Sequence, residues 1–315
     1  MRAVLVQNGV RLERNAAEPS AQGDQALIRV RRAGICNTDL ELVAGYMNFS
    51  GILGHEFVGE VIDGAPDLAG QRVVGEINVA CGHCDFCQRG IPSQCRNRTT
   101  VGIDRHPGAF ADYLALTRRN LHVVPDTVRD DQAVFVEPLA AALQIYEAVH
   151  LSPRDRVVLI GAGKLGMLVA QVVRLIGCDL VTVVRREKQA RLLNAWGIAA
   201  VGEDEIEPLR ADVVIDCTGT SEGFAQALKW VKARGTIVLK STYTGIPQAN
   251  LTQVAVNEIR IIGSRCGPFE SALRLLHMGL VDVESLIERR YPLDEAMNAL
   301  KYAGQHGVLK VLLDI

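Results

Sequence analysis

The sequence predicts an α/β fold with a doubly wound parallel sheet and a second, strand-rich domain. At 315 residues the chain is too long for one core of ordinary size, so we expect two domains. From about residue 155, continuous apolar strands alternate with helical stretches, the pattern of a parallel sheet covered on both faces. Before about residue 125 the hydrophobic period is nearer two, which favours short strands.

In the first part, Gly, Pro and Asp separate the expected strands. Residues 1–14 lack the long apolar core of a signal peptide and are expected to form the first strand. Further strands are predicted at 26–31, 57–62, 72–76 and 110–115.

In the second part, each apolar strand is followed by a turn and, in most cases, a helical pattern. Strands are predicted at 156–160, 180–184, 212–216, 236–240 and 259–262, and the first helix at 164–176. Two more helical stretches follow residue 263, and the chain closes with a terminal strand predicted at 307–315.

Composition and charge exclude several classes of function. The chain is 48% hydrophobic and 22% charged, as globular proteins are. Its net charge of -2 gives no electrostatic basis for binding nucleic acid or an anionic membrane surface. No apolar run is long enough to span a membrane. We expect a cytoplasmic protein, whose eight cysteines bind metal or fill core in a reducing environment rather than form disulfides.

Four cysteines lie in one short stretch with the spacing C-x2-C-x2-C-x7-C. They are Cys81, Cys84, Cys87 and Cys95. Four thiolates can surround one tetrahedral Zn²⁺ and leave no position open for substrate. The cluster therefore predicts a zinc site that stabilises structure and does no chemistry.

Residues 161–166 carry the pattern G-x-G-x-x-G directly after an apolar strand and at the start of a helix. The residues concerned are Gly161, Gly163, Lys164, Leu165 and Gly166. In this context the glycines permit a tight turn, close backbone approach to a pyrophosphate and close packing of the helix on its strand. The free N–H groups at the helix start then favour the phosphates. A glycine-rich turn that binds nothing is the alternative.

The end of the next strand indicates which dinucleotide binds. NAD sites usually place an acidic residue about twenty positions further on, to bond the ribose 2′-OH. Here the corresponding residues are Arg185 and Arg186, with no carboxylate beside them. Guanidinium groups suit a 2′-phosphate, so we favour NADP and keep NAD as possible. Two solvated arginines with no cofactor role are the alternative.

Three further residues offer a second set of metal donors. Cys36, His55 and Glu137 supply one sulfur, one nitrogen and one oxygen. This mixture suits a Zn²⁺ ion with a fourth position left for water or substrate. Sequence spacing alone does not establish that the three converge.

Six motifs follow one another along the chain: C-x-T-D at 36–39, G-H-E at 54–56, the four cysteines, E-P-L at 137–139, G-x-G-x-x-G, and D-V-V-I-D-C-T-G at 212–219. This order resembles the zinc-dependent medium-chain dehydrogenase/reductase family, most of all its polyol and threonine dehydrogenase branch. The resemblance implies a GroES-like β-barrel catalytic domain (1–137 and 265–315) with a structural zinc lobe (81–95), and an inserted Rossmann domain (138–264).

The resemblance also implies roles for the residues around the metal. Cys36 and His55 match the first two ligands of the catalytic zinc, and Glu137 matches the carboxylate ligand of the polyol branch. Glu56 matches a residue that sits next to the metal and ligates it in some members. With the structural site, two zinc ions per chain are expected.

Other positions match the proton relay and the cofactor site. Thr38 matches the hydroxyl that passes the alcohol proton outward, and Asp39 matches a carboxylate that orients His55. Thr218 falls among the cofactor-binding residues. Many members carry a His five residues after the first cysteine ligand. Here that position is Glu41, so either Glu41 or solvent takes the proton.

We therefore expect a zinc-dependent oxidoreductase that transfers a hydride between a secondary alcohol, polyol or sugar and a nicotinamide cofactor. An NADPH-dependent aldehyde or aryl-alcohol reductase is one alternative, and a zinc-independent quinone-reductase-like or non-enzymatic NADPH-binding protein is a more remote one. The expected partners are a small alcohol or carbonyl substrate and further copies of the chain in a homodimer or homotetramer. Neither nucleic acid nor a membrane is expected as a partner.

Overall fold

The computed structural model describes residues 1–208, 210–243 and 246–315, and the chain forms two compact units. Unit 1 consists of Met1–Glu137 and Phe269–Ile315, and unit 2 of Pro138–Pro268. Residues 265–268, assigned above to the catalytic domain, belong to unit 2. They do so because the Lys240 ammonium binds the Arg265 carbonyl, and because Gly267 lies against the backbone of Ala140.

Unit 2 contains a six-stranded, wholly parallel sheet in the order β14-β13-β12-β15-β16-β17. Its strands are β12 (Arg156–Ile160), β13 (Asp179–Val183), β14 (Ala199–Val201), β15 (Ala211–Asp216), β16 (Val231–Leu239) and β17 (Arg260–Gly263). The order reverses between β12 and β15, which is the signature of a doubly wound sheet. This confirms the predicted fold class.

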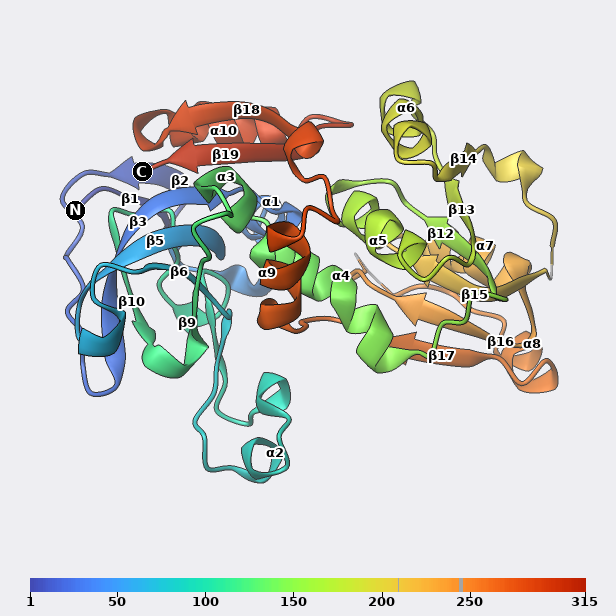
Figure 1. Ribbon diagram of the computed structural model, residues 1–315, viewed down its shortest axis with the longest axis horizontal. Helices are drawn as coiled ribbons and strands as arrows, with labels where there is room; N and C mark the ends of the chain where they lie inside the picture. The colour runs from blue at the N-terminus through green and yellow to red at the C-terminus, as the bar shows by residue number, and fades with distance from the viewer. Residues whose placement is uncertain (209, 244–245) are drawn as a thin grey trace. The chain divides into compact units, whose positions relative to one another are not determined.

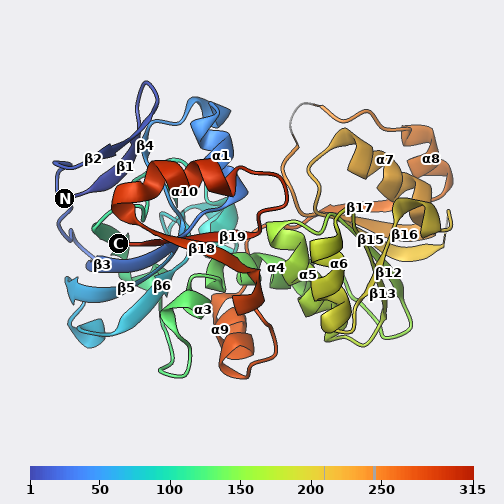
Figure 2. The same cartoon turned by 90° about the horizontal axis from the view of Figure 1, so that it is seen from above.

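Helices cover both faces of this sheet. They are α5 (Lys164–Arg174), α6 (Glu187–Ala195), α7 (Ser221–Trp230) and α8 (Leu251–Val256). Figure 2 shows α5 and α6 on one side of the sheet and α7 and α8 on the other. Right-handed crossovers produce this arrangement when the strand order reverses.

The sheet core explains why the strands of unit 2 could be predicted. Four of the five residues of β12 are buried, since both faces of the strand are covered. The exception is β16, which begins at Val231 rather than at residue 236. Near its start the strand carries the exposed side chains of Lys232, Ala233 and Arg234. The apolar run that marks a buried strand therefore starts several residues after the strand itself.

Unit 1 is built mainly from antiparallel strands. A seven-stranded sheet has the order β11-β6-β5-β3-β19-β18, with β10 also paired to β3. Its strands are β3 (Gln25–Gly34), β5 (Glu56–Asp63), β6 (Arg72–Gly75), β10 (Tyr113–Thr117), β11 (Leu121–Val123), β18 (Ile287–Pro292) and β19 (Lys310–Asp314). The C-terminal strand β19 lies beside β3 from the N-terminal part, with Leu312 opposite Gly34 (Figure 1).

Two smaller sheets complete unit 1. One has the order β2-β1-β4, from Val10–Glu13, Ala3–Val6 and Gly51–Ile52. The other, β7-β8-β9, joins Asn78–Val79, Thr99–Val101 and Arg105–His106 beside the four cysteines. The helices are α1 (Asn37–Val43), α2 (Asp85–Gln88), α3 (Asp130–Ala133), α9 (Phe269–His277) and α10 (Ala296–Ala303), while α4 (Val136–Ala148) begins at the last residues of the N-terminal segment.

Three details of unit 1 differ from the sequence predictions. Residues 1–14 form the hairpin β1–β2 rather than one strand, because Asn8 and Gly9 take positive φ angles and turn the chain. The strand expected at 110 begins at Tyr113, since Phe110 is buried and bonds to the backbone of Leu53 instead. Strand β18 was not predicted, because its sequence IERRYP is polar and largely exposed.

In the described residues, no helix has the length and apolar character that crossing a bilayer requires.

Candidate metal centres and dinucleotide site

The C-x-T-D motif forms the first turn of α1. Cys36 precedes the helix in an extended conformation, and Asp39 Oδ2 accepts a hydrogen bond of 2.8 Å from the Cys36 backbone N–H. This carboxylate therefore satisfies one of the free donors at the helix start. Thr38 Oγ1 lies 3.8 Å from Cys36 Sγ. The helix cap thus fixes a thiol and a hydroxyl side by side.

His55 reaches the same place from the turn before β5. Gly54 has a φ of +98°, and a Cβ at this position would collide with the ring of Phe110, so the turn requires glycine. His55 and Asp39 are both buried, and His55 Nδ1 lies 3.3 Å from Asp39 Oδ1. The carboxylate engages Nδ1 and so leaves Nε2 as the nitrogen that can bind a metal.

Cys36, His55 and Glu56 form a cluster of potential metal ligands. One donor atom of each lies within 4.8 Å of the others. Although burial lowers the pKa of His55, the charges of Asp39 and Cys36 and their hydrogen bonds hold that pKa well above its usual value. The electrostatic potential is therefore negative here, and the sulfur, nitrogen and oxygen donors fit Zn²⁺.

Lys310 is a buried residue of this cluster that the sequence analysis missed. Its ammonium donates to Glu56 Oε2 and lies 5.3 Å from the centroid of the Phe135 ring. Burial lowers the pKa of Lys310, but Glu56, Cys36 and Glu137 outweigh this effect and raise it. A lysine directly before the apolar run Val311–Leu313 of strand β19 was the signal in the sequence.

Glu137 approaches the same region from the start of α4. It does not belong to the three-residue cluster, which contains Glu56 as its carboxylate. Its charge nevertheless contributes to the raised pKa of Lys310. Its assignment as the third ligand of a catalytic zinc therefore stays a prediction.

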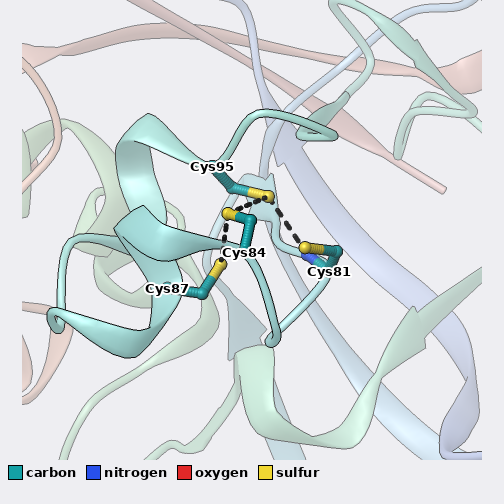
Figure 3. Close-up of side chains that lie close together, drawn as sticks. All are labelled: Cys81, Cys84, Cys87 and Cys95. Carbon is teal, nitrogen blue, oxygen red and sulfur yellow. Dashed lines mark hydrogen bonds between the residues drawn. The ribbon is translucent and has the colours of Figure 1, made fainter.

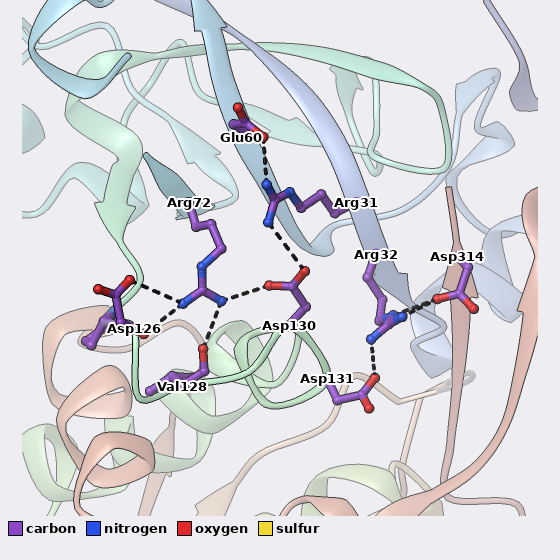
Figure 4. Close-up of polar contacts among 10 residues, drawn as sticks. Arg31, Arg32, Glu60, Arg72, Asp126, Val128, Asp130, Asp131 and Asp314 are labelled. Atoms are coloured by element: carbon purple, nitrogen blue, oxygen red, sulfur yellow. Dashed lines mark hydrogen bonds and ion pairs between the residues drawn. The ribbon is translucent and has the colours of Figure 1, made fainter. Parts of the chain in front are cut away.

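Ion pairs hold α3, which leads into α4, against the seven-stranded sheet (Figure 4). Arg32 of β3 bonds Asp131 of α3 at 2.6 Å, and Arg72 of β6 bonds Asp130 at 2.8 Å. Arg290 of β18 also pairs with Asp131. These contacts fix the short segment that ends at Glu137.

The four cysteines of the second site converge, as Figure 3 shows. Cys84 Sγ lies 3.5 Å from Cys87 Sγ and 3.9 Å from Cys95 Sγ. Four sulfurs bound tetrahedrally at about 2.3 Å from Zn²⁺ would lie about 3.8 Å apart, so the arrangement fits the ion. Backbone hydrogen bonding at His83 lowers the pKa of Cys81 to about 6, which favours one thiolate from the start.

The loop after β12 has the three glycine positions that a dinucleotide site requires. Gly161 has a φ of +95°, and a Cβ on Gly166 would lie 1.8 Å from the Gly161 carbonyl oxygen. Gly163 faces open space, where a pyrophosphate can approach the backbone. Lys164 and Leu165 form the first turn of α5, whose N–H groups start here.

The other expected cofactor residues lie at the same, carboxyl edge of the sheet. Arg185 and Arg186 follow β13 and are exposed, and their side chains make no hydrogen bond or ion pair among the described residues. Thr218 follows β15, and its N–H and hydroxyl both donate to Asp216 Oδ1, at 2.8 and 2.7 Å. The two guanidinium groups are therefore available to an anionic ligand.

Comparison with known proteins agrees with this geometry. Family models match two segments: the alcohol dehydrogenase GroES-like domain at residues 22–126 and zinc-binding dehydrogenase at residues 165–278. A Sinorhizobium meliloti protein described as a zinc-binding dehydrogenase and crystallised with NADP has a TM-score of 0.91 and 30% sequence identity, over 100% of this chain and 99% of that chain.

The relatives similar over nearly the whole chain include polyol dehydrogenases and L-threonine 3-dehydrogenases. Sorbitol dehydrogenase of Halalkalibacterium halodurans is 28% identical over 94% of this chain and 93% of its own length. D-arabitol-phosphate dehydrogenase of Enterococcus avium is 26% identical over 94% of this chain and 91% of its own length. The chain belongs to the zinc-type medium-chain alcohol dehydrogenase family. The predicted family and its two domain types, GroES-like and Rossmann, are thereby confirmed.

Proposed function

We propose that the protein is a zinc-dependent oxidoreductase that transfers a hydride between a secondary alcohol, polyol or sugar, or the matching carbonyl compound, and a nicotinamide cofactor. The observation that carries the proposal is the cluster of partly buried Cys36 with buried His55 and Glu56, in a chain that also has a complete dinucleotide loop. The sorbitol and arabitol-phosphate dehydrogenase relatives support polyols over the aldehyde or aryl-alcohol alternative. The buried donor set itself argues against a zinc-independent role.

Cys36 and His55, with Glu137 as the proposed third ligand, would hold the catalytic zinc, and Glu56 would lie beside it. When bound there, the ion would supply stabilisation of negative charge on the substrate oxygen. Cys81, Cys84, Cys87 and Cys95 would hold the structural ion, so we expect two zinc ions per chain.

The side chains around Cys36 would manage the proton. Thr38 Oγ1, beside the Cys36 thiol, would accept the alcohol proton and pass it outward. Burial raises the pKa of Glu41, and the hydrogen bond from Asn37 only partly offsets this. Glu41 is therefore a better proton acceptor than an ordinary carboxylate, and we propose it as the outer member of the relay. Asp39 would hold the ring of His55 in one orientation.

We propose NADP as the preferred cofactor. Arg185 and Arg186 are exposed at the end of β13 without protein partners among the described residues, and guanidinium groups suit a 2′-phosphate. The Sinorhizobium meliloti relative, crystallised with NADP, supports the same choice.

We also propose a homodimer, or a homotetramer built from such dimers, that forms through the edge of the unit 2 sheet. Among the described residues, strand β17 has only β16 beside it, and Ile261 on it is 38% exposed. Leu251 and Val256 of α8 are also exposed apolar side chains. Pairing of two β17 strands about a twofold axis would cover this edge. None of the eight cysteines forms a disulfide, which suits a cytoplasmic location for the assembly.

Zinc content and turnover test the proposal together. The wild-type protein should contain two zinc ions per chain and oxidise sugar alcohols or vicinal diols in a screen with both cofactors. Cys36→Ala should keep the fold, contain one zinc ion, and lose about 10³-fold in kcat/KM, since charge stabilisation by the metal is worth several kcal/mol.

Cys178→Ala is the matched control, because Cys178 is a free cysteine of unit 2 outside both clusters. It should keep two zinc ions and full activity. Undiminished turnover by a Cys36→Ala protein that has lost one zinc ion would exclude the proposed mechanism.

A further inference from the structure

Unit 2 contains a buried lysine at the carboxyl edge of its sheet to which the reaction described above gives no role. Cys217, Lys240 and Ser264 each follow the end of a strand, and backbone hydrogen bonds join them into a row. Cys217 N–H donates to Ile160, Lys240 N–H to Asp216, and Ser264 N–H to Leu239, at 2.9, 2.9 and 3.0 Å. The row therefore continues the sheet by one residue beyond β15, β16 and β17.

The Lys240 ammonium ties three segments together. Its side chain is buried, and it donates to the Ala141 carbonyl of α4, to Ser264 Oγ and to the Arg265 carbonyl, at 2.5, 3.0 and 3.4 Å. The segment after β17 also lies against α4 at Gly267, where a Cβ would be 2.0 Å from the Ala140 carbonyl oxygen. The path of residues 264–267 thus depends on one buried charge. An apolar residue of similar size would not serve equally, because it would remove the donor that these three acceptors share.

Asp216 fixes the neighbouring segments in a similar way. It is fully buried, and its Oδ1 accepts from the Thr218 N–H and hydroxyl. Its other oxygen accepts from the Tyr243 hydroxyl, while the Tyr243 ring makes an edge contact with Phe224. Burial, and then the bond to Asp216, raise the pKa of Tyr243, so the phenol stays protonated as the donor.

The position of this network in the sheet indicates which ligand depends on it. A doubly wound sheet binds a dinucleotide across the point where the strand order reverses, with one nucleotide half on each side. The glycine loop after β12 and the arginines after β13 lie on the side of the adenosine half. The segments after β15, β16 and β17 lie on the opposite side, where the nicotinamide half must bind.

We propose that Lys240 and Tyr243 are positioning residues for the nicotinamide half of the cofactor. Lys240 holds the segment after β17, and Tyr243, through Asp216, holds the segments after β15 and β16. This inference rests on the proposed nicotinamide dependence. Neither residue needs to touch the cofactor, because each acts through the backbone that it fixes.

The test compares whole cofactors with fragments that lack nicotinamide. Dissociation constants are measured by calorimetry for NADPH and 2′-phospho-ADP-ribose, and for NADH and ADP-ribose, with the full-length protein. In Lys240→Met, which keeps the length of the side chain, we expect binding of the reduced cofactor to weaken by about tenfold, because hydrogen bonds from a charged group are lost. Binding of the fragments should change less than about twofold, since the adenosine half binds elsewhere.

Lys232→Met is the matched control, because Lys232 lies on the same strand and is exposed in an ion pair with Asp212. It should change neither the dissociation constant of the reduced cofactor nor that of the fragment. Equal weakening of cofactor and fragment in Lys240→Met would indicate a general structural role and overturn the proposal, as would no weakening at all. If the wild-type protein binds neither cofactor, the proposed function fails instead.

Tyr243→Phe keeps the inference testable if Lys240→Met does not fold. It retains the ring against Phe224 and removes only the hydroxyl that Asp216 accepts. We expect about fivefold weaker binding of the reduced cofactor, because one hydrogen bond is lost. Binding of the fragment should be unchanged. Unchanged binding of both would contradict the role of Tyr243.

Discussion

At the scale of single residues, the metal cluster depends on two backbone features that bring Cys36 and His55 together. The cap that Asp39 provides fixes Cys36 at the start of α1, and the positive φ of Gly54 turns His55 toward it. Asp39 serves both ligands, since one oxygen binds the Cys36 N–H and the other faces His55. The removal of this one carboxylate would therefore disturb two ligands.

We expect one or two residues to decide the choice of cofactor as well. Arg185→Asp should shift the ratio of kcat/KM for NADP over NAD by at least about tenfold toward NAD. The guanidinium that binds a 2′-phosphate is lost, and the new carboxylate repels that phosphate while it can bond a ribose 2′-OH. Steady-state kinetics with both cofactors measure the ratio.

Arg191→Asp is the control for this measurement. Arg191 is an exposed residue of α6 that pairs with Glu187 one turn away, so its replacement should leave the ratio unchanged. If Arg185→Asp also leaves it unchanged, the arginines do not select the cofactor.

At the scale of elements, the short helix α3 is held in place by charge. Asp131 lies between Arg32 of β3 and Arg290 of β18 (Figure 4 shows the contact with Arg32). Burial raises the pKa of Asp131, but the bond from Arg290 and the charge of Arg32 outweigh this and leave the pKa below its usual value. The ionised carboxylate therefore stabilises the folded state.

Asp131→Asn should lower the free energy of unfolding by about 1–2 kcal/mol at pH 7. Because the folded-state pKa is depressed, this contribution is complete above the unfolded value of about 3.9 and is lost as pH falls through the folded value. Urea unfolding of mutant and wild type at pH 7, 5 and 3.5 should thus show a difference that shrinks only at the lowest pH.

Asp126→Asn tests whether the stability depends on the particular ion pairs that hold α3 or on any acidic residue nearby. Asp126 is fully exposed and its carboxylate lies 4.0 Å from the Arg72 guanidinium, so solvent screens the pair and its loss should leave the free energy of unfolding nearly unchanged. Equal destabilisation by the two substitutions would argue that α3 is not held by its specific pairs.

The same elements show what the sequence could and could not predict. Strand β12 was predicted because a strand buried on both faces is a continuous apolar run. Strand β18 was missed because exposed charges conceal its strand pattern. The contact between Glu56 and Lys310 joins residues 254 positions apart, so only the folded sheet, in which β19 lies beside β3, can reveal it. For the same reason, the spacing of Cys36, His55 and Glu56 could not show that they converge, and only the family resemblance named all three as neighbours of a metal.

At the scale of the whole molecule, we propose that the exposed edge of the unit 2 sheet is where copies of the chain associate. An edge strand with apolar side chains is prone to pair with other strands unless a partner covers it. Ile261 lies on this edge, and Ile246, Leu251 and Val256 are exposed in the segments that precede β17. A closed twofold dimer covers such an edge and prevents open-ended pairing.

We expect Ile261→Asp to convert the dimer, or the tetramer built from it, to monomers, because two carboxylates would face each other across the twofold axis without solvation. Light scattering coupled to gel filtration measures the mass, for which one chain contributes 34.2 kDa. Ile62→Asp is the control, since Ile62 is equally exposed, at 37% against 38%, but lies on β5 of unit 1. It should leave the mass unchanged. A wild-type mass of one chain, or an Ile261→Asp protein that keeps the wild-type mass, would show that the β17 edge does not join the subunits.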